Sequence, residues 1–228
     1  MIHHDENIIT LGIRTTNGSF INFCYIIYDK SSREGILVDP SWEPEKINHL
    51  LYEHEVIVKH ILLTHHHFDH INLSDYYTYT TSAPVWISEK EYEFYKPNLN
   101  NILLFNNNKE IQFGSCACVA IVTPGHTAGS SCFKINNHLF CGDTIFPEGC
   151  GICTSLGGNP NEMFKSIQLL KKNLNKSVKI FPGHSYGSAP GIELESILKT
   201  NIYMQIDDEE TFVKFRMRTN QRDFMEFH

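Results

Sequence analysis

The sequence has 228 residues, 41% of them hydrophobic, which is enough for one sizeable core, and we expect a single domain over residues 1–228. A formal net charge of −7 argues against nucleic acid or an anionic membrane surface as the main partner. No apolar run approaches the length needed to span a bilayer, and residues 1–5 lack the pattern of a secretory signal. We therefore expect a cytoplasmic protein.

The first predicted elements are strands. Residues 8–9, 21–28 and 35–40 are rich in β-branched and aromatic side chains, and Asn17-Gly18 marks a turn between the first two runs. Pro44 begins a predicted helix whose apolar residues Ile47, Leu50 and Leu51 recur at helical spacing. Such a helix packs on a sheet.

A concentration of metal-ligand side chains follows the apolar residues 56–63. If these residues end a buried strand, His65 and His67 point to the same side, and Asp69 and His70 follow as the chain turns. Imidazole and carboxylate groups are ligands that Zn²⁺ takes, and two pairs so close together can serve two neighbouring ions. A polar loop with histidines by chance is the alternative.

Further elements alternate between strands and helices. Residues 83–87 form a predicted strand, and Ser88 to Glu91 has the form of a capping box for the next helix. Six asparagines within residues 98–108 indicate a loop, with an apolar stretch at 102–105. Strands are predicted at residues 116–122, 130–135 and 139–141.

The last third adds helices to this pattern. Asn159 caps a helix that begins at Pro160, residues 178–181 form a strand, and helices are expected near 192–198 and 207–216. Strands and helices interleave without a long β-α-β-α run. The predicted fold class is therefore α+β, with two mixed β-sheets packed together and covered by helices.

Three isolated residues resemble further metal ligands. His126, Asp143 and His184 each lie at the end of an apolar run, and a glycine precedes each of them. Glycine permits tight turns, so successive strand ends can present one side chain each to a common centre. Any one of these residues alone would more often belong to a structural turn. With the first loop they complete a binuclear set.

The ordered motif resembles that of the metallo-β-lactamase-fold hydrolases, whose T-H-x-H-x-D-H signature matches Thr64 to His70 and is followed by separated His, Asp and His. The resemblance covers residues 7–186 and implies an αββα sandwich, two Zn²⁺ per chain and hydrolysis by an activated water. It implies a first ion on His65, His67 and His126, and a second on Asp69, His70 and His184, with Asp143 bridging them. Asp69 would also orient the water, His66 occupies the variable position, and Asp39 would brace the metal loop.

Within that fold the chain is similar to the glyoxalase II branch, which cleaves thioesters. Tyr186 lies two residues beyond His184, where that branch has a tyrosine facing the substrate. Two features differ. Ile152 replaces the cation that grips the glutathione carboxylate, and the long carboxyl-terminal helical domain is missing, leaving a basic tail with Arg216, Arg218 and Arg222.

These departures make the chain most similar to the zinc-dependent hydrolases of bacterial polyketide biosynthesis. That resemblance implies acyl-thioester substrates, with acyl carrier protein as the candidate carrier and the basic tail as a candidate docking element. Glyoxalase II and a general thioesterase are the main alternatives. A persulfide dioxygenase with one Fe²⁺ and a non-catalytic metal-binding protein are the others.

The cysteines favour a reduced protein. Their number, seven, is odd, and they are scattered through apolar runs, which is typical of buried thiols and not of a disulfide framework. Cys150 and Cys153 have the spacing of a redox or zinc site, but a second C-x-x-C pair is missing. We expect a structural role for these two residues.

Overall fold

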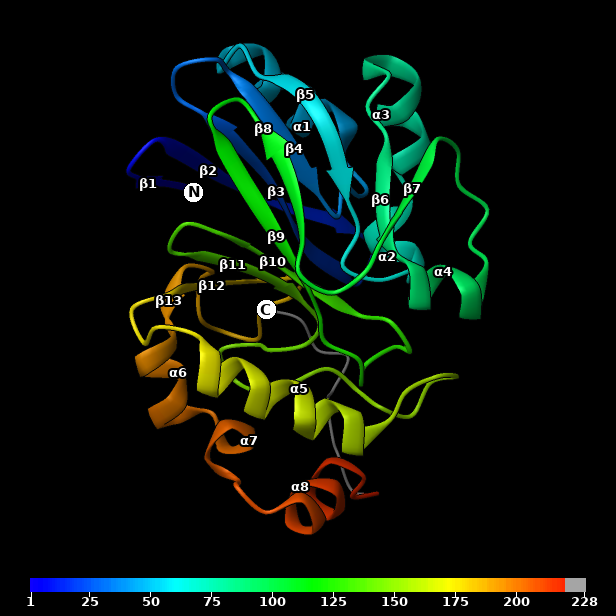
Figure 1. The fold of residues 1–228 in the computed structure, drawn as a ribbon, viewed down its shortest axis with the longest axis vertical. Coiled ribbons are helices and arrows are strands. Elements are labelled where there is room, and N and C mark those ends of the chain that lie inside the picture. Colours follow the sequence, from blue (N-terminus) through cyan, green and yellow to red (C-terminus); the bar gives the residue numbers. More distant parts are fainter. Residues whose placement is uncertain (220–228) are drawn as a thin grey trace.

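Two β-sheets pack face to face in the computed structural model, which describes residues 1–219, and helices cover their outer faces (Figure 1). The first sheet contains seven strands in sequence order from β1 to β7. Its strands are β1 (Ile2–Asp5), β2 (Ile8–Asn17), β3 (Phe20–Asp29), β4 (Glu34–Val38), β5 (Ile57–Leu62), β6 (Val85–Ser88) and β7 (Ile102–Phe105).

The first sheet is antiparallel from β1 to β4 and parallel from β4 to β7. Parallel neighbours need crossover connections, and helices supply them. The crossovers contain α1 (Pro44–Glu53), α2 (Phe68–Ile71), α3 (Ser74–Thr81) and α4 (Glu89–Tyr95). Ile47 of α1 and Tyr77 of α3 are buried in an apolar cluster with residues of this sheet.

The second sheet has six strands in the order β13-β12-β11-β10-β9-β8. Its strands are β8 (Lys109–Phe113), β9 (Cys116–Val122), β10 (Ser131–Ile135), β11 (His138–Gly142), β12 (Lys179–Pro182) and β13 (Ile192–Glu193). All neighbours are antiparallel except β11 and β12, which are parallel. Both sheets are therefore mixed, as predicted.

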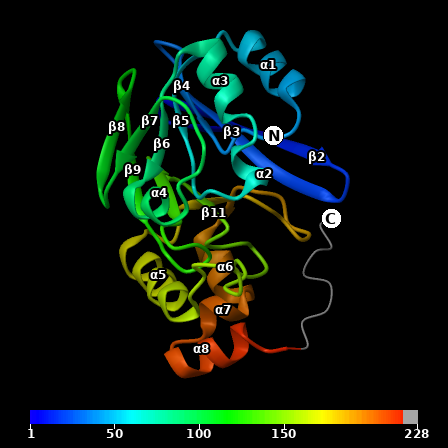
Figure 2. The same cartoon turned by 90° about the vertical axis from the view of Figure 1, so that its right-hand side faces the viewer.

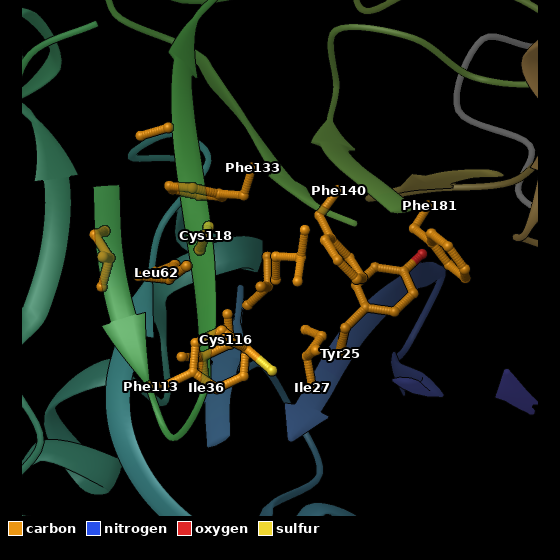
Figure 3. Close-up of a cluster of buried hydrophobic side chains, with 14 of the residues drawn as sticks. Tyr25, Ile27, Ile36, Leu62, Phe113, Cys116, Cys118, Phe133, Phe140 and Phe181 are labelled. Atoms are coloured by element: carbon orange, nitrogen blue, oxygen red, sulfur yellow. The ribbon is translucent and has the colours of Figure 1, made fainter. Parts of the chain in front are cut away.

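A continuous apolar core joins the two sheets. Tyr25 and Ile27 of β3 face Phe133, Phe140 and Phe181 of the second sheet, and all five side chains are buried (Figure 3). The Tyr25 and Phe140 ring centroids are 5.2 Å apart, and those of Phe140 and Phe181 are 5.1 Å apart. These contacts hold the sheets in one fixed relation, which the site at their edge requires.

Four helices cover the outer face of the second sheet (Figure 2). They are α5 (Pro160–Asn173), α6 (Leu194–Thr200), α7 (Ile202–Gln205) and α8 (Glu209–Arg216). Ile167 of α5 and Phe212 of α8 are buried in one cluster with Leu139 and Ile180 of the sheet. Within residues 1–219, no helix combines the length and apolar character needed to cross a membrane. The observed layers confirm the αββα arrangement.

Several local predictions were incomplete. The apolar stretch inside the expected loop at 98–108 is strand β7, and the short elements β1, α2 and α3 were not predicted. The predicted helix at 192–198 begins as β13, and the helix expected at 207–216 is preceded by α7. Each of these differences concerns a short element, for which local sequence pattern is a weak guide.

Candidate metal centre

The candidate ligands lie just beyond the carboxyl ends of four strands, β5, β9, β11 and β12. Gly183 N donates to Gly142 O at 2.9 Å, which keeps the parallel ends of β11 and β12 together. Gly142 adopts a φ of 46°, and a Cβ there would collide with the Thr64 side chain. Glycine at this position therefore allows the second sheet to approach the loop that follows β5.

Three histidines converge to form what we call the first group, His65, His67 and His126. His65 Nε2 and His126 Nε2 each lie 3.0 Å from His67 Nδ1. The three side chains come from the loop after β5 and the loop after β9, so both sheets contribute. Such an arrangement of imidazole nitrogens can hold one cation.

Asp69, His70 and His184 form the second group. His184 Nε2 lies 3.3 Å from His70 Nε2 and 3.3 Å from Asp69 Oδ2. Asp143 lies between the groups, because its Oδ1 is 3.5 Å from His70 Nε2 and its Oδ2 is 3.5 Å from His126 Nε2. The structure thus brings together all the ligands predicted from the sequence.

Backbone carbonyl groups orient two of these histidines. His126 Nδ1 lies 2.7 Å from Ile152 O, and His184 Nδ1 lies 2.7 Å from Ile21 O. A carbonyl oxygen can only accept, so Nδ1 carries the hydrogen in both rings. Nε2 of each ring then faces the site and is the atom that a metal ion would take.

Asp39 could also form a ligand set with His65 and His70. Its oxygens, however, accept hydrogen bonds from Thr64 N at 2.8 Å, Thr64 Oγ1 at 2.6 Å and His70 Nδ1 at 2.9 Å. Asp39 itself has a left-handed φ of 48°. These contacts are those of a residue that braces the metal loop, in agreement with the expectation from the sequence.

The surroundings of the first group favour neutral imidazoles. Burial is the largest cause that lowers the pKa of His65, His67 and His126, and neighbouring histidines contribute further. The pKa of His67 falls to about 3. Neutral imidazoles have the free lone pairs that a cation needs.

The second group has the opposite character. Burial opposes charge here, but Asp69, Asp143 and Asp39 raise the pKa of His70 to about 10, and Asp143 and Asp69 raise that of His184. Burial likewise opposes ionisation of Asp69, yet His70, His184 and Asn22 hold its pKa well below the usual value. In the second group, ionised carboxylates and the imidazoles beside them therefore stabilise each other's charged forms.

The residues present fit a divalent cation. Asp143 Oδ1 is buried and has no hydrogen-bond partner among the described residues, although a carboxylate oxygen of this kind is costly to leave unpaired. A Cβ on Gly183 would lie too close to His70 and Asp143, so the glycine keeps this space open. Imidazole nitrogens with carboxylate oxygens are a zinc-type donor set.

A pocket of about 260 Å³ opens onto both groups. Its wall is largely apolar and includes Phe20, Phe146, Ile152 and Tyr186. The rings of Tyr186 and Phe146 lie 5.3 Å apart at an interplanar angle of 66°. Tyr186 and Ile152 thus both line the pocket beside the two ligand groups.

Arg216 was predicted to belong to a surface tail, and this prediction was wrong. The residue is only 4% exposed, lies at the end of α8, and forms part of the pocket wall. Its Nη1 donates to Tyr203 Oη at 2.8 Å. Arg218 also donates to Tyr203 Oη, at 3.0 Å, and Arg222 lies outside the described residues. Arg216 is therefore unavailable for docking a protein at the surface.

Glu91 has a role that the sequence did not reveal. Its buried Oε1 accepts from His66 N at 3.0 Å and lies 2.7 Å from His66 Nδ1, while Oε2 accepts from Thr127 Oγ1 at 2.9 Å and Gly129 N at 2.7 Å. One carboxylate thus joins the two loops that carry the first group. The capping-box pattern predicted the helix start correctly, and Ser88 Oγ does accept from Glu91 N.

The two cysteines with C-x-x-C spacing are both buried. Burial raises the pKa of the Cys150 and Cys153 thiols, to about 11 for Cys153. A thiol with a raised pKa is a poor nucleophile and a poor metal ligand at neutral pH. The structural role expected for this pair is consistent with these surroundings.

Comparison with known proteins agrees with this architecture. The sequence profile described as Metallo-beta-lactamase superfamily matches residues 17–112. The crystal structure of ETHE1 from Myxococcus xanthus has a TM-score of 0.82 at 21% identity, covering 95% of this chain and 94% of that chain. At this identity the likeness shows the fold alone.

Relatives with similar sequences include the following two. One is named a probable polyketide biosynthesis zinc-dependent hydrolase, BaeB, of Bacillus velezensis, and is 43% identical over 215 residues, 94% of this chain and 96% of that protein. A hydroxyacylglutathione hydrolase of Shewanella loihica is 32% identical over 177 residues, 74% of this chain and 63% of that protein. From the fold, the ligand motif and these relatives, the chain belongs to the metallo-beta-lactamase superfamily and is a hydrolase of that superfamily.

Proposed function

We propose that the protein is a binuclear zinc hydrolase that cleaves acyl thioesters, with the acyl group carried on an acyl carrier protein in polyketide biosynthesis. The observation that carries the proposal is the apolar pocket that opens directly onto the two ligand groups. The similarity to the Bacillus velezensis hydrolase over nearly the whole of both chains supports the biosynthetic assignment.

The proposed first ion is held by His65, His67 and His126, and the second by Asp69, His70 and His184, with Asp143 between them. When bound, zinc polarises a carbonyl oxygen and lowers the pKa of a bound water molecule to about 7. Asp69 lines the pocket and has a carboxylate that can accept a hydrogen bond from the attacking water. No serine or cysteine nucleophile is needed, and burial raises the pKa of the Cys150 thiol in the wall, which makes it a poor nucleophile.

The remaining wall is suited to a slender neutral chain. Phe146, Ile152 and Tyr186 offer apolar surface beside the metal centre. A pantetheine arm presents neutral amides and a narrow aliphatic chain, which such a wall accepts without leaving a charge unpaired. Tyr186 is the proposed contact of the substrate near the reacting carbonyl.

Glutathione thioesters are the competing substrates, because the Shewanella loihica relative is a hydroxyacylglutathione hydrolase. A glutathione carboxylate needs a fixed cation, and Ile152 cannot supply one. Arg216 places a guanidinium elsewhere in the wall, where it donates to Tyr203 Oη. Glutathione therefore brings a carboxylate that this wall does not pair, and pantetheine does not, so kcat/KM should differ between the two carriers.

The test is a steady-state comparison on the zinc-loaded enzyme. The substrates are one acyl group on acyl carrier protein, the same group on a pantetheine mimic, and S-lactoylglutathione. We expect kcat/KM to be higher for the carrier-protein and pantetheine thioesters. A clear preference for the glutathione thioester would make the protein a glyoxalase II, and comparable turnover of all three would make it a general thioesterase.

Metal analysis separates the proposal from a different reaction class. We expect about two zinc ions per chain in protein purified without chelator, because each ligand group can hold one. A single tightly bound iron, together with oxygen consumption on a persulfide, would identify a persulfide dioxygenase. Bound metal without turnover of any thioester would identify a metal-binding protein.

A further inference from the structure

Asn22, near the start of β3, forms two hydrogen bonds with Asp69. Its buried side-chain Nδ2 donates to Asp69 Oδ2 at 2.9 Å and to the backbone Asp69 O at 3.0 Å. The neighbouring residue, Ile21, accepts from His184 Nδ1 at 2.7 Å. Two successive residues of β3 thus hold two members of the second group.

The orientation of the Asn22 amide is set by Trp42. Trp42 Nε1 donates to Asn22 Oδ1 at 2.7 Å. An indole N–H can only donate, so the amide oxygen of Asn22 faces Trp42 and the amide nitrogen faces Asp69. The chemistry of the tryptophan therefore excludes the flipped amide, in which two oxygens would face each other at Asp69.

Trp42 is itself fixed in an unusual conformation. Its φ is 66°, a left-handed value that is rare for a large side chain, and its backbone N donates to Asn72 Oδ1 at 2.9 Å. Asn72 is the C-cap residue of α2, the helix that contains Asp69. The indole ring lies 5.9 Å from Phe20 and 5.7 Å from Phe68 by ring centroids. These contacts thus hold the indole N–H of Trp42 in place.

We propose that Trp42 and Asn22 are positioning residues that fix the Asp69 carboxylate in the second group through the hydrogen-bonded series Trp42–Asn22–Asp69. The inference rests on the proposed role of Asp69 as a ligand and water acceptor. Loss of the indole N–H allows the Asn22 amide to turn, and its oxygen then repels the carboxylate. Partners of a metal ligand that act in this way typically contribute about 10–100-fold in metal affinity or activity.

The test replaces Trp42 by phenylalanine, which keeps an aromatic ring between Phe20 and Phe68 but removes the N–H donor. The chain offers a matched control, because Trp86 of β6 also donates its indole N–H, to His60 Nδ1 at 3.1 Å, and lies outside the pocket wall. Trp42→Phe and Trp86→Phe therefore remove the same donor in two places.

Two measurements are made on both variants. Titration of the metal-free proteins with zinc is expected to show that Trp42→Phe binds the ion of the second group about tenfold less tightly, with the affinity for the ion of the first group unchanged. Where a thioester substrate is turned over, kcat should fall about tenfold with KM within twofold of the parent value. Trp86→Phe should match the parent protein in both.

A double-substitution cycle excludes a general loss of structure. Asn22→Leu should weaken the same ion, and adding Trp42→Phe to it should have little further effect, because both residues act through Asp69. Additive losses, or equal behaviour of Trp42→Phe and Trp86→Phe, would overturn the inference. Since zinc titration needs no substrate, failure of the thioester proposal and failure of this inference give different results.

Discussion

The two ligand groups are a few ångströms apart and similarly buried, yet they differ in charge. The first group contains only imidazoles, whose pKa values burial holds below the ordinary value. The second contains Asp69, and its histidines have raised pKa values because carboxylates face them. Asp143 lies within 3.5 Å of His70 and His126 and so belongs to the surroundings of both.

Because of this difference, two identical ions bound at the site would have different charge environments. The first group has only neutral imidazoles, so an ion held there would keep most of its positive charge and could polarise a substrate oxygen. In the second group the Asp69 carboxylate would offset part of the charge of an ion held there, and it could also accept a hydrogen bond from water. The supporting contacts differ as well, since Glu91 joins the loops of the first group and Asn22 holds the second.

Removing the two proposed ions should abolish the activity. We expect dialysis against a chelator to give inactive, folded protein that regains activity with zinc. If zinc is present at about 100 times its dissociation constant, it adds about 2.7 kcal/mol of stability, a rise in Tm of about 5–10 °C for a chain of this size. Calorimetry with and without zinc measures this. Full activity in chelator would exclude a metal mechanism.

Asp69→Ala tests the second group alone. Loss of a ligand and of the water acceptor should lower kcat/KM by about 10³-fold in a protein that still folds. Elemental analysis should show one retained ion, in the first group. Unchanged turnover would remove Asp69 from the mechanism.

Glu91→Gln tests the first group alone. The amide cannot accept from all the donors around Glu91, namely His66 N, His66 Nδ1, Thr127 Oγ1 and Gly129 N, so the two loops should separate slightly. We expect first-group zinc affinity to fall by about 10–100-fold. Zinc titration checks this, with Glu93→Gln on the exposed side of the same helix as the control. Selective loss of the other ion would contradict the assignment.

Ile152→Lys should have the smallest effect, because it alters the pocket wall and not the ions. A cation at this position can pair with a glutathione carboxylate, and a charged hydrogen bond of about 1.5 kcal/mol corresponds to about a tenfold gain in kcat/KM for S-lactoylglutathione. Leu156→Lys, on a residue that is 80% exposed, introduces the same charge outside the pocket wall and is the control. Equal responses of both variants would exclude a specific carboxylate contact.

The ligands themselves were accessible from the sequence because most of the information is local. Residues 64–70 form a contiguous motif, and His126, Asp143 and His184 each follow an apolar run with an adjacent glycine. The close approach at Gly142 and Gly183 explains why glycine occurs there. The layered fold followed from the order of strands and helices, and the structure confirmed it.

The supporting residues could not be found in the same way. Asn22 and Trp42 lie in the sequence far from Asp69, and they meet because β3, β4 and β5 are neighbours in the first sheet. Glu91 matched a capping pattern, which explains the helix start but not where the carboxylate points. Arg216 looked like part of a basic tail because burial of its side chain depends on how α8 packs. These roles depend on tertiary contacts for which the sequence has no periodic signal.

Because the first group takes His65 and His67 from the loop after β5 and His126 from the loop after β9, an ion bound there joins the two sheets. It can be captured only after the sheets have packed on their shared core, so it contributes little to the folding transition state. Its binding energy is lost when the sheets separate. Zinc should therefore slow unfolding much more than it accelerates refolding, and give the loaded enzyme a long lifetime even where its equilibrium stability is ordinary.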